Sequence, residues 1–151
     1  MRGITIKVVV QVVSHANVVV DKKICGKIEK GYMILVGFNN NDNLENVEKM
    51  AQKVANLRIF EDENGKLNLS IKDVSGKILS ISQFTLYGDA KKGNRPSFVD
   101  ALNGDKAKPL YDRFNELLEK KYEIEVQKGV FGAHMKVSLL NEGPVTIILE
   151  N

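Results

Sequence analysis

The sequence is short of the residues on which disulfide-bonded and metal-stabilised proteins depend. It holds one cysteine, Cys25, among 151 residues, which excludes an internal disulfide and is typical of a reducing compartment. Cys25 lies in a strand-like run, where a buried and unreactive thiol is the expected state. The two histidines, His15 and His134, are far apart in sequence and have no partner at a metal-ligand spacing. We therefore expect no metal site.

Long apolar runs are missing as well. The longest run, VVVQVV at residues 8–13, contains a glutamine and is far shorter than the roughly 20 residues of a membrane-spanning helix. The first residues lack the apolar core of a secretory signal, and charged residues at 21–23 interrupt the next apolar stretch. A cytoplasmic location without a membrane partner is the expectation.

Proline is scarce, and no stretch rich in glycine and serine is long enough to separate domains. Only three prolines occur, at positions 96, 109 and 144. We expect one domain over residues 1–151. A chain of this length buries roughly two thirds of its unfolded surface, so it needs no disulfide or metal to fold.

Familiar catalytic and cofactor motifs are also absent. Without a G-x-G-x-x-G motif or a P-loop, no nucleotide cofactor is indicated, and we expect no cofactor of any kind. There is no G-x-S-x-G turn either. A catalytic triad stays open at this stage, because its members are brought together by the fold and not by sequence spacing.

Short β-branched runs and two amphipathic segments predict an α+β fold. The expected strands cover residues 7–13, 18–20, 24–28, 32–38, 77–84, 123–127, 135–140 and 145–149. Residues 141–144 (NEGP) are interpreted as a hairpin turn between the last two strands. Closely spaced strands joined by turns favour a small antiparallel, barrel-like sheet.

The two helices are predicted from apolar residues at helical spacing. The first covers residues 44–57, with Asp42 or Asn43 as its N-cap. Its apolar stripe consists of Leu44, Val47, Met50, Ala51, Val54 and Leu57. The second covers about residues 105–120, with a stripe of Ala107, Leu110, Tyr111, Phe114, Leu117 and Leu118.

Three segments carry polar or charged residues in unusual places. Residues 82–89 (SQFTLYGD) end a predicted strand with hydroxyl and amide groups, which form either a satisfied structural network or a binding surface. Residues 141–146 (NEGPVT) include a glycine whose backbone can approach another group closely. The densest basic cluster consists of Lys91, Lys92 and Arg95. Net charge is only +3, so a solvated loop is the simplest interpretation of this cluster.

Four ordered sequence blocks resemble the D-aminoacyl-tRNA deacylase family. They are NLRIFEDENGKLNLS (56–70), SQFTLYGD (82–89), KKGNRPSF (91–98) and FGAHMKVSLLNEGPVT (131–146). The resemblance implies a barrel-like α+β domain that pairs as a homodimer, with residues 1–6 as a short N-terminal extension. It also implies a carboxylic ester hydrolase that frees tRNA and a D-amino acid from D-aminoacyl-tRNA, and that accepts glycine on tRNA. No DNA partner is implied.

The resemblance also assigns roles to individual residues. Gly143 and Pro144 match a Gly–cis-Pro pair that enters the pocket of the partner subunit and rejects L-amino acids by clash. The catalytic segment would consist of Ser82, Gln83, Phe84 and Thr85. The residues near the terminal adenosine would be Phe131, Gly132 and Met135. The RNA-binding residues of the basic loop would be Lys91, Lys92 and Arg95. An aromatic ring and a thioether suit stacking on a base.

The resemblance leaves two catalytic routes open. Thr85 could be the nucleophile, although a hydroxyl is weak without a base beside it. The alternative uses no protein nucleophile: backbone N–H groups near Gln83 and Phe84 stabilise the oxyanion, and the tRNA 2′-hydroxyl helps to activate water. We favour the second route, because an activated ester needs little beyond positioning and an oxyanion hole.

One position departs from the family pattern. Residues 11–13 read Gln-Val-Val, so Val12 stands where the family usually has an arginine that holds the Gly–Pro pair. This departure supports one rival interpretation, a non-catalytic tRNA-binding dimer of the same fold. The other rivals are a hydrolase of free D-amino-acid esters or amides, which needs no basic loop, and a purely structural homodimer, which leaves the polar strand end unexplained.

Overall fold

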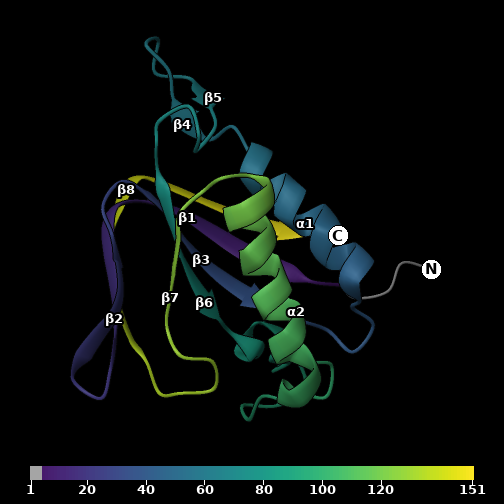
Figure 1. Ribbon diagram of the computed structural model, residues 1–151. Coiled ribbons are helices and arrows are strands. Elements are labelled where there is room, and N and C mark those ends of the chain that lie inside the picture. Colours follow the sequence, from purple (N-terminus) through teal and green to yellow (C-terminus); the bar gives the residue numbers. More distant parts are fainter. Residues whose placement is uncertain (1–4) are drawn as a thin grey trace.

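Two long strands, one near each end of the chain, organise the fold (Figure 1). The computed structural model describes residues 5–151. Strands β1 (Lys7–Val20) and β8 (Lys136–Glu150) pair antiparallel along almost their whole length. The other elements are β2 (Lys23–Ile28), β3 (Gly31–Gly37), α1 (Leu44–Asn56), β4 (Phe60–Glu61), β5 (Leu67–Leu69), β6 (Lys77–Ser82), η1 (Phe84–Tyr87), α2 (Gly104–Glu116), η2 (Leu117–Lys121) and β7 (Val126–Lys128).

Five strands form an almost closed barrel. The first half of β1 pairs antiparallel with β3, and its second half pairs antiparallel with β2. Strand β6 continues the sheet from β3, and β7 continues it from β6. At the closure, a Cβ built on Gly26 of β2 would lie 2.9 Å from the carbonyl oxygen of Lys128 in β7. Strand β8 lies outside this ring, and within residues 5–151 only its β1 edge is paired.

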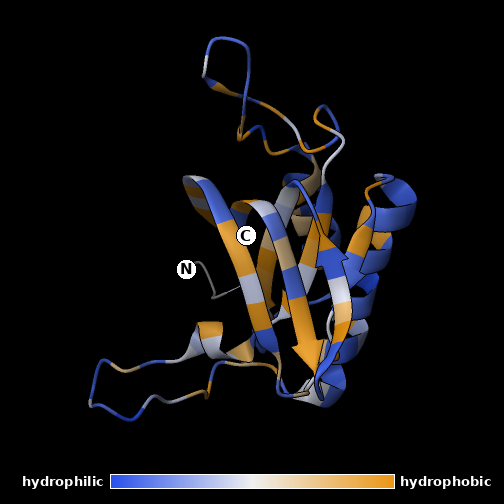
Figure 2. Cartoon of the chain, turned by 90° about the vertical axis from the view of Figure 1, so that its left-hand side faces the viewer, coloured by the Kyte–Doolittle hydropathy of each residue, from blue (hydrophilic) through white to orange (hydrophobic). Residues whose placement is uncertain are grey.

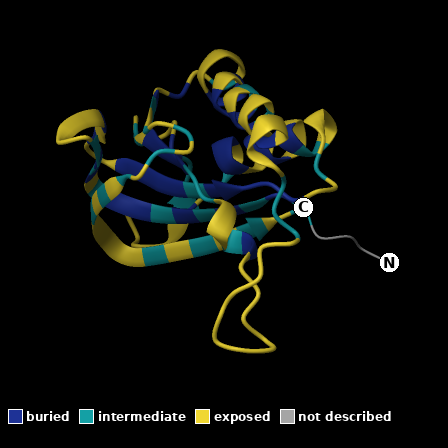
Figure 3. Ribbon diagram, turned by 90° about the horizontal axis from the view of Figure 1, so that it is seen from below, coloured by how far each residue is buried: buried dark blue, intermediate teal, exposed yellow. Residues whose placement is uncertain are grey.

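Two apolar layers lie on opposite faces of the shared strands. Inside the barrel, Val18, Met33 and Leu79 belong to the smaller core cluster. On the outer face, alternate residues of β1, β3 and β6 belong to the larger cluster with α1 and α2, which lie side by side (Figure 1). Figure 3 shows the buried strands between the helices and the largely exposed β8.

The two helices form as the apolar spacing predicts. Asn43 is the N-cap of α1, and its side chain accepts a hydrogen bond from the Asn46 backbone N–H at 3.0 Å. Asp42, the alternative cap, instead binds the backbone N–H groups of Ile6 and Asn39. Leu44 was expected in the buried stripe but is 57% exposed, because it occupies the first helical position beside open solvent.

The predicted α+β class, the barrel-like sheet and the two helices are confirmed. The predicted antiparallel pairing holds for the pairs of β1 with β2, β3 and β8, but not for the whole sheet. Strands β3 and β6 pair in parallel, and so do β6 and β7. The reason lies in the connections: helix α1 and hairpin β4–β5 separate β3 from β6, and α2 separates β6 from β7. Crossovers of this length return the chain in the same direction.

The predicted hairpin turn at residues 141–144 is also wrong. These residues lie within β8, and strands 135–140 and 145–149 are halves of one strand. Both halves find partners on β1, where Val13 pairs with Asn141 and Gln11 pairs with Thr146. The intervening residues form an irregularity instead of a reversal, because β1 is long enough to bind both halves. The predicted strands 7–13 and 18–20 merge into β1 for the same reason.

Smaller differences have local causes. The strand predicted over residues 77–84 ends at Ser82, and the chain then turns into the short helix η1. Cys25 is exposed, because the alternation along β2 directs Gly26 and Ile28 inward instead. Of the expected extension at 1–6, residues 1–4 lie outside the described residues, while Ile6 is fully buried in the core.

Candidate functional site

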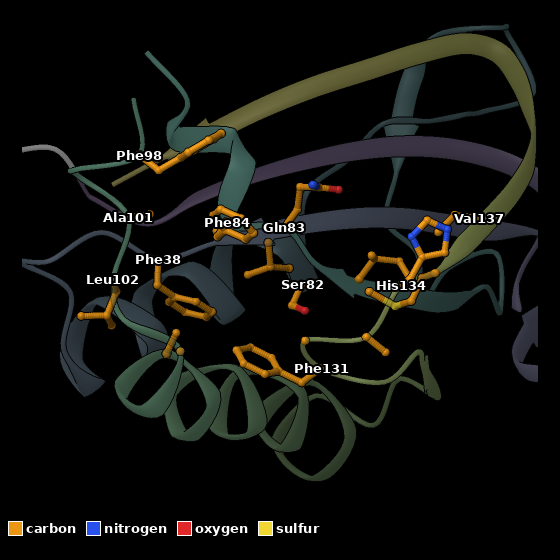
Figure 4. Close-up of a pocket in the computed structure, with 18 residues that line it drawn as sticks. Phe38, Ser82, Gln83, Phe84, Phe98, Ala101, Leu102, Phe131, His134 and Val137 are labelled. Carbon is orange, nitrogen blue, oxygen red and sulfur yellow. The ribbon is translucent and has the colours of Figure 1, made fainter. Parts of the chain in front are cut away.

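A cavity of about 620 Å³ lies at the C-terminal end of β6. Its walls come from the ends of β3 and β6, from the segment that leads into α2, and from the loop between β7 and β8. Ser82 and Phe131 face one another across it (Figure 4). The sequence blocks 82–89 and 131–146 therefore meet at one site although about 50 positions separate them.

The polar end of β6 forms one wall of this cavity. Ser82 and Gln83 are half-buried there, and the Gln83 backbone N–H donates to the Val36 carbonyl at 2.8 Å. The backbone N–H of Phe84, one residue further on, has no hydrogen-bond partner among residues 5–151. Of the two amides proposed for an oxyanion hole, only that of Phe84 can therefore donate to a bound group.

Thr85 lies beside the cavity wall and not in it. Its side chain is exposed, and the residues that line the cavity stop at Phe84 in this segment. The Gln83 side-chain amide donates a hydrogen bond to the Thr85 hydroxyl. Within the described part of the chain, no histidine or carboxylate forms a hydrogen bond to that hydroxyl. The geometry thus gives Thr85 no base to activate it.

The opposite wall carries the three residues expected near a terminal adenosine. Phe131, Gly132 and Met135 all line the cavity. Gly132 has a φ of +79°, a left-handed conformation that turns the loop back toward β8. The Phe131 ring lies 5.8 Å from the ring of Tyr111 in α2, which supports it from behind.

The basic loop lies next to the cavity mouth. Backbone hydrogen bonds of 2.8 Å in both directions join Asp89 and Ser97 and close the loop at its base. Beside this base, the rings of Phe84 and Phe98 meet edge to face at 5.2 Å, and both line the cavity. The loop projects from the body and is exposed (Figure 3). Its three cations are Lys91, Lys92 and Arg95, and none has a carboxylate within 4.0 Å in residues 5–151.

Gly143 and Pro144 are not part of this cavity. The peptide bond between them is cis, and both residues are exposed in β8. Gly143 instead lines a second cavity of about 420 Å³. Val12 lies in the same cavity and leaves only an apolar side chain at the position where the family resemblance expects an arginine.

The two cavities lie at opposite ends of β3. The first is lined by Val36 at the C-terminal end of the strand, and the second by Lys30, just before its start. A single chain therefore keeps the Gly–Pro pair away from the Ser82–Phe84 segment.

Several residues that line the first cavity have no functional role assigned from the sequence. Phe38, Phe98 and His134 are among them, and Figure 4 shows them around the same space. Phe98 and His134 lie inside the resembling blocks 91–98 and 131–146, so the blocks contained the signal without a role for them. Phe38 is 4% exposed and was interpretable from sequence only as a core residue at the end of a strand.

The described residues contain no cluster that could hold a metal ion. No three histidine, cysteine, aspartate or glutamate side chains come together between residues 5 and 151. None of the helices over these residues is both long enough and apolar enough to cross a membrane.

Solved structures define the class of fold. Over 96% of this chain and 98% of the other, the fold matches that of a c-Myc DNA unwinding element binding protein, with a TM-score of 0.89 and 42% sequence identity. A probable eukaryotic D-amino acid tRNA deacylase matches over 97% of this chain and all of the other, with a TM-score of 0.86 and 19% identity. The second match, at this low identity, concerns the fold alone.

Sequence comparison then identifies the family. A family model described as D-Tyr-tRNA(Tyr) deacylase matches residues 9–150. The D-aminoacyl-tRNA deacylase of Lactobacillus gasseri is 54% identical over 95% of this chain and 99% of its own length. That of Fusobacterium nucleatum is 56% identical over 95% of each chain. The chain belongs to the D-Tyr-tRNA(Tyr) deacylase family, which confirms the resemblance found in the sequence and the expectation of an enzyme.

Proposed function

We propose that this protein hydrolyses the ester bond between a D-amino acid and the 3′-terminal adenosine of tRNA. The observation that carries the proposal is the meeting of two family blocks, 82–89 and 131–146, around one cavity. The names of its relatives supply the reaction class. Glycine charged onto tRNA is a further substrate, since it has no side chain for the site to reject.

The reaction proceeds by attack of water on the ester carbonyl carbon. The carbonyl oxygen becomes an oxyanion in the tetrahedral intermediate, and the free Phe84 N–H donates to it. The tRNA 2′-hydroxyl orients the attacking water. The bond between the carbonyl carbon and the 3′-oxygen then breaks. One proton of the attacking water passes to the 3′-oxygen, the other is released to solvent, and the amino acid leaves as the carboxylate. Thr85 is not the nucleophile in this route, since its only described side-chain partner is an amide.

The substrate's terminal nucleotides bind along the cavity and its mouth. Phe131 and Met135 contact the terminal adenine, for which an aromatic ring and a thioether are suited. The unpaired cations of the loop, Lys91, Lys92 and Arg95, contact phosphates of the acceptor stem. Phosphate contacts carry no sequence information, which suits an enzyme that accepts many tRNAs.

The complete site forms in a homodimer, in which Gly143 and Pro144 of one protomer enter the first cavity of its partner. Three features support this arrangement. The outer edge of β8 is unpaired within residues 5–151 and can pair with another chain. Large apolar side chains are exposed on β8 and at the cavity mouth, among them Leu140 (53%), Ile148 (63%) and Phe84 (58%). The Gly–Pro pair itself is exposed and outside its own chain's first cavity.

This arrangement gives a physical basis for chiral selection. Carbonyl oxygens of the inserted Gly–Pro pair occupy the space that an L side chain would need, so L substrates clash and D substrates fit. Rejection by clash requires no recognition of the side chain, and the enzyme accepts many D-amino acids. Selection acts on the amino acid, and the basic loop acts on the tRNA.

The runner-up is a tRNA-binding dimer of the same fold without catalytic activity. It rests on Val12, because an apolar side chain beside Gly143 offers no hydrogen bond to hold the Gly–Pro pair. It predicts tight binding of tRNA without release of the amino acid.

Release of labelled tyrosine from D-Tyr-tRNA and L-Tyr-tRNA, measured side by side, tests the proposal. Fast loss of the D ester alone is the expected result. Loss of both esters would retain the enzyme but refute chiral selection. Loss of neither, above the rate in buffer, would refute the deacylase and favour the runner-up. Because one structural neighbour is named for DNA binding, single-stranded DNA of the CCA-end sequence serves as a competitor, and we expect it to inhibit weakly.

A further inference from the structure

Tyr111 joins two walls of the first cavity from behind. Its side chain is 4% exposed in α2, and its hydroxyl donates a hydrogen bond to the Ser80 carbonyl at 2.8 Å. Ser80 lies two residues before Ser82 on β6. On the other side, the Tyr111 ring contacts the ring of Phe131, with centroids 5.8 Å apart and planes at 40°. One buried side chain therefore contacts both β6, two residues before the catalytic segment, and Phe131 of the adenosine wall.

The hydroxyl is the link between α2 and β6. Within residues 5–151, no other hydrogen bond joins these two elements. Burial raises the pKa of Tyr111, so the hydroxyl keeps its proton and remains a donor at neutral pH. The nearby Ser80 hydroxyl and the Asn115 side-chain amide are buried and have no hydrogen-bond partner in the described chain. They therefore add no hydrogen bond between α2 and β6.

We propose that Tyr111 is a positioning residue for deacylation, which sets the spacing between Phe131 and the end of β6. Its ring supports Phe131 in the orientation that stacks on the terminal adenine, and its hydroxyl holds β6 so that the Phe84 N–H points at the ester. The inference rests on the proposed function and deepens it. According to this proposal, Tyr111 affects the binding of the terminal base although it does not contact the substrate.

Tyr32 offers a matched control. It is a fully buried tyrosine whose hydroxyl donates to a backbone carbonyl, that of Leu57, at 3.4 Å. Its ring also packs on a phenylalanine, Phe60, with centroids 5.0 Å apart. Neither Tyr32 nor Phe60 lines the first cavity, whereas Phe60 lines the second, so the control is compared through KM and terminal-base preference, which are assigned to the first cavity. Equivalent substitutions at the two tyrosines therefore separate a positioning role from a general loss of stability.

The experiment compares Tyr111→Phe and Tyr111→Leu with Tyr32→Phe and Tyr32→Leu. Each variant is assayed for kcat and KM on D-Tyr-tRNA ending in adenosine and on the same tRNA ending in cytidine, and its Tm is measured. Tyr111→Leu should raise KM about tenfold and lower the preference for adenosine several-fold, the scale of one lost base stack. Tyr111→Phe keeps the ring, so it should leave KM near the wild-type value and lower kcat about three- to tenfold. The Tyr32 variants should lower Tm without changing KM or the preference for a terminal adenosine over cytidine.

The inference is overturned if the Tyr111 variants change only Tm, or if the Tyr32 variants shift KM and terminal-base preference equally. Should Tyr111→Leu fail to fold, Tyr111→Phe and its kcat against Tyr32→Phe decide the question. If the wild-type protein releases no amino acid, the proposed function fails separately. The inference is then tested by binding of uncharged RNA hairpins ending in adenosine or cytidine. A loss of the adenosine preference in Tyr111→Leu alone supports it, and an unchanged preference overturns it.

Discussion

The two ends of β3 carry surfaces of different character. At its C-terminal end lies the larger cavity, whose walls are mostly apolar and aromatic with a few polar groups from β6. At its N-terminal end the smaller cavity carries charged side chains, Lys30, Glu61 and Glu142, beside the exposed Gly143. Figure 2 shows apolar and polar residues alternating along the strands that face the viewer. The first surface encloses a cavity, whereas the second presents the exposed Gly143 and Pro144 outward.

In the proposed homodimer, each chain contributes half of two different active sites. In that dimer, the larger cavity of one protomer supplies the substrate pocket, and the Gly–Pro pair of its partner supplies the chiral selection. Such a dimer requires two chains paired in opposite orientation, so that each end lies against the complementary end of its partner, as expected for a two-fold interface.

Replacement of Gly143 by alanine should lower the deacylation rate more than substitution at Phe131, in the basic loop or at Thr85. Gly143 has a φ of +124°, and a Cβ there would lie 2.9 Å from Val145 Cγ2, so the segment must shift. A displacement of this kind in a fitted site costs about 100-fold in rate, and the ratio of D to L hydrolysis should fall with it. Steady-state deacylation of both esters measures it. Gly65→Ala is the control, because Gly65 also has a positive φ but no atom lies within 4 Å of its Cβ position. Equal losses in both variants would contradict the assignment.

Removal of the aromatic ring at Phe131 should damage only the cavity end. Phe131→Ala should raise KM for D-aminoacyl-tRNA about tenfold and change kcat little, because the lost stack binds the ground and transition states alike. Phe131→Tyr keeps the ring and should retain the wild-type KM. The D to L ratio should stay unchanged in both variants. A fall in that ratio would show that the cavity wall, and not the Gly–Pro pair, selects the chirality.

Neutralising the basic loop should weaken tRNA binding without altering the first cavity or the Gly–Pro pair. The triple change of Lys91, Lys92 and Arg95 to alanine should lower the slope of log KM against log salt by about two to three. Hydrolysis of a D-aminoacyl-adenosine, which has no phosphate, should be unaffected. The control variant changes Lys53 and Lys66, both exposed and away from the cavity. An unchanged salt slope in the triple variant would show that the loop is merely solvated.

The smallest effect is expected at Thr85. Thr85→Ala removes a hydroxyl that has only the Gln83 amide as its described side-chain partner, so kcat should fall by only about two- to fivefold. Thr85→Ser should lie closer to the wild type. A loss of a thousandfold or more, measured under single-turnover conditions, would contradict the water route and make Thr85 the nucleophile.

The sequence predicted local features well because they depend on neighbouring residues. Helical spacing located α1 and α2, and Asn43 was recognised as one of two caps. The polar end of β6 and the NEGPVT segment stood out because each breaks the pattern of the surrounding strand. The two segments lie at the first and second cavities. Residues at functional sites are expected to depart from the apolar pattern of a strand.

The remaining features depend on long-range pairing, which spacing cannot reveal. Residues 141–144 have the composition of a turn, but β1 provides partners on both sides and keeps β8 continuous. Parallel pairing of β3, β6 and β7 depends on where the helical connections return the chain. His134 enters the cavity only because the loop before β8 folds against β6. None of these contacts leaves a local signal in the sequence.

In the proposed homodimer, each active site combines the first cavity of one protomer with the Gly–Pro pair of the other. The most direct measurement uses a heterodimer of Phe131→Ala and Gly143→Ala chains, isolated through two different affinity tags and assayed on D-Tyr-tRNA below KM. If the sites are shared, one of the two sites contains only unaltered parts, and the rate should be about half that of the wild type. If each chain forms its own site, both sites are damaged. The rate would then not exceed the mean of the two homodimeric variants, which would contradict the account.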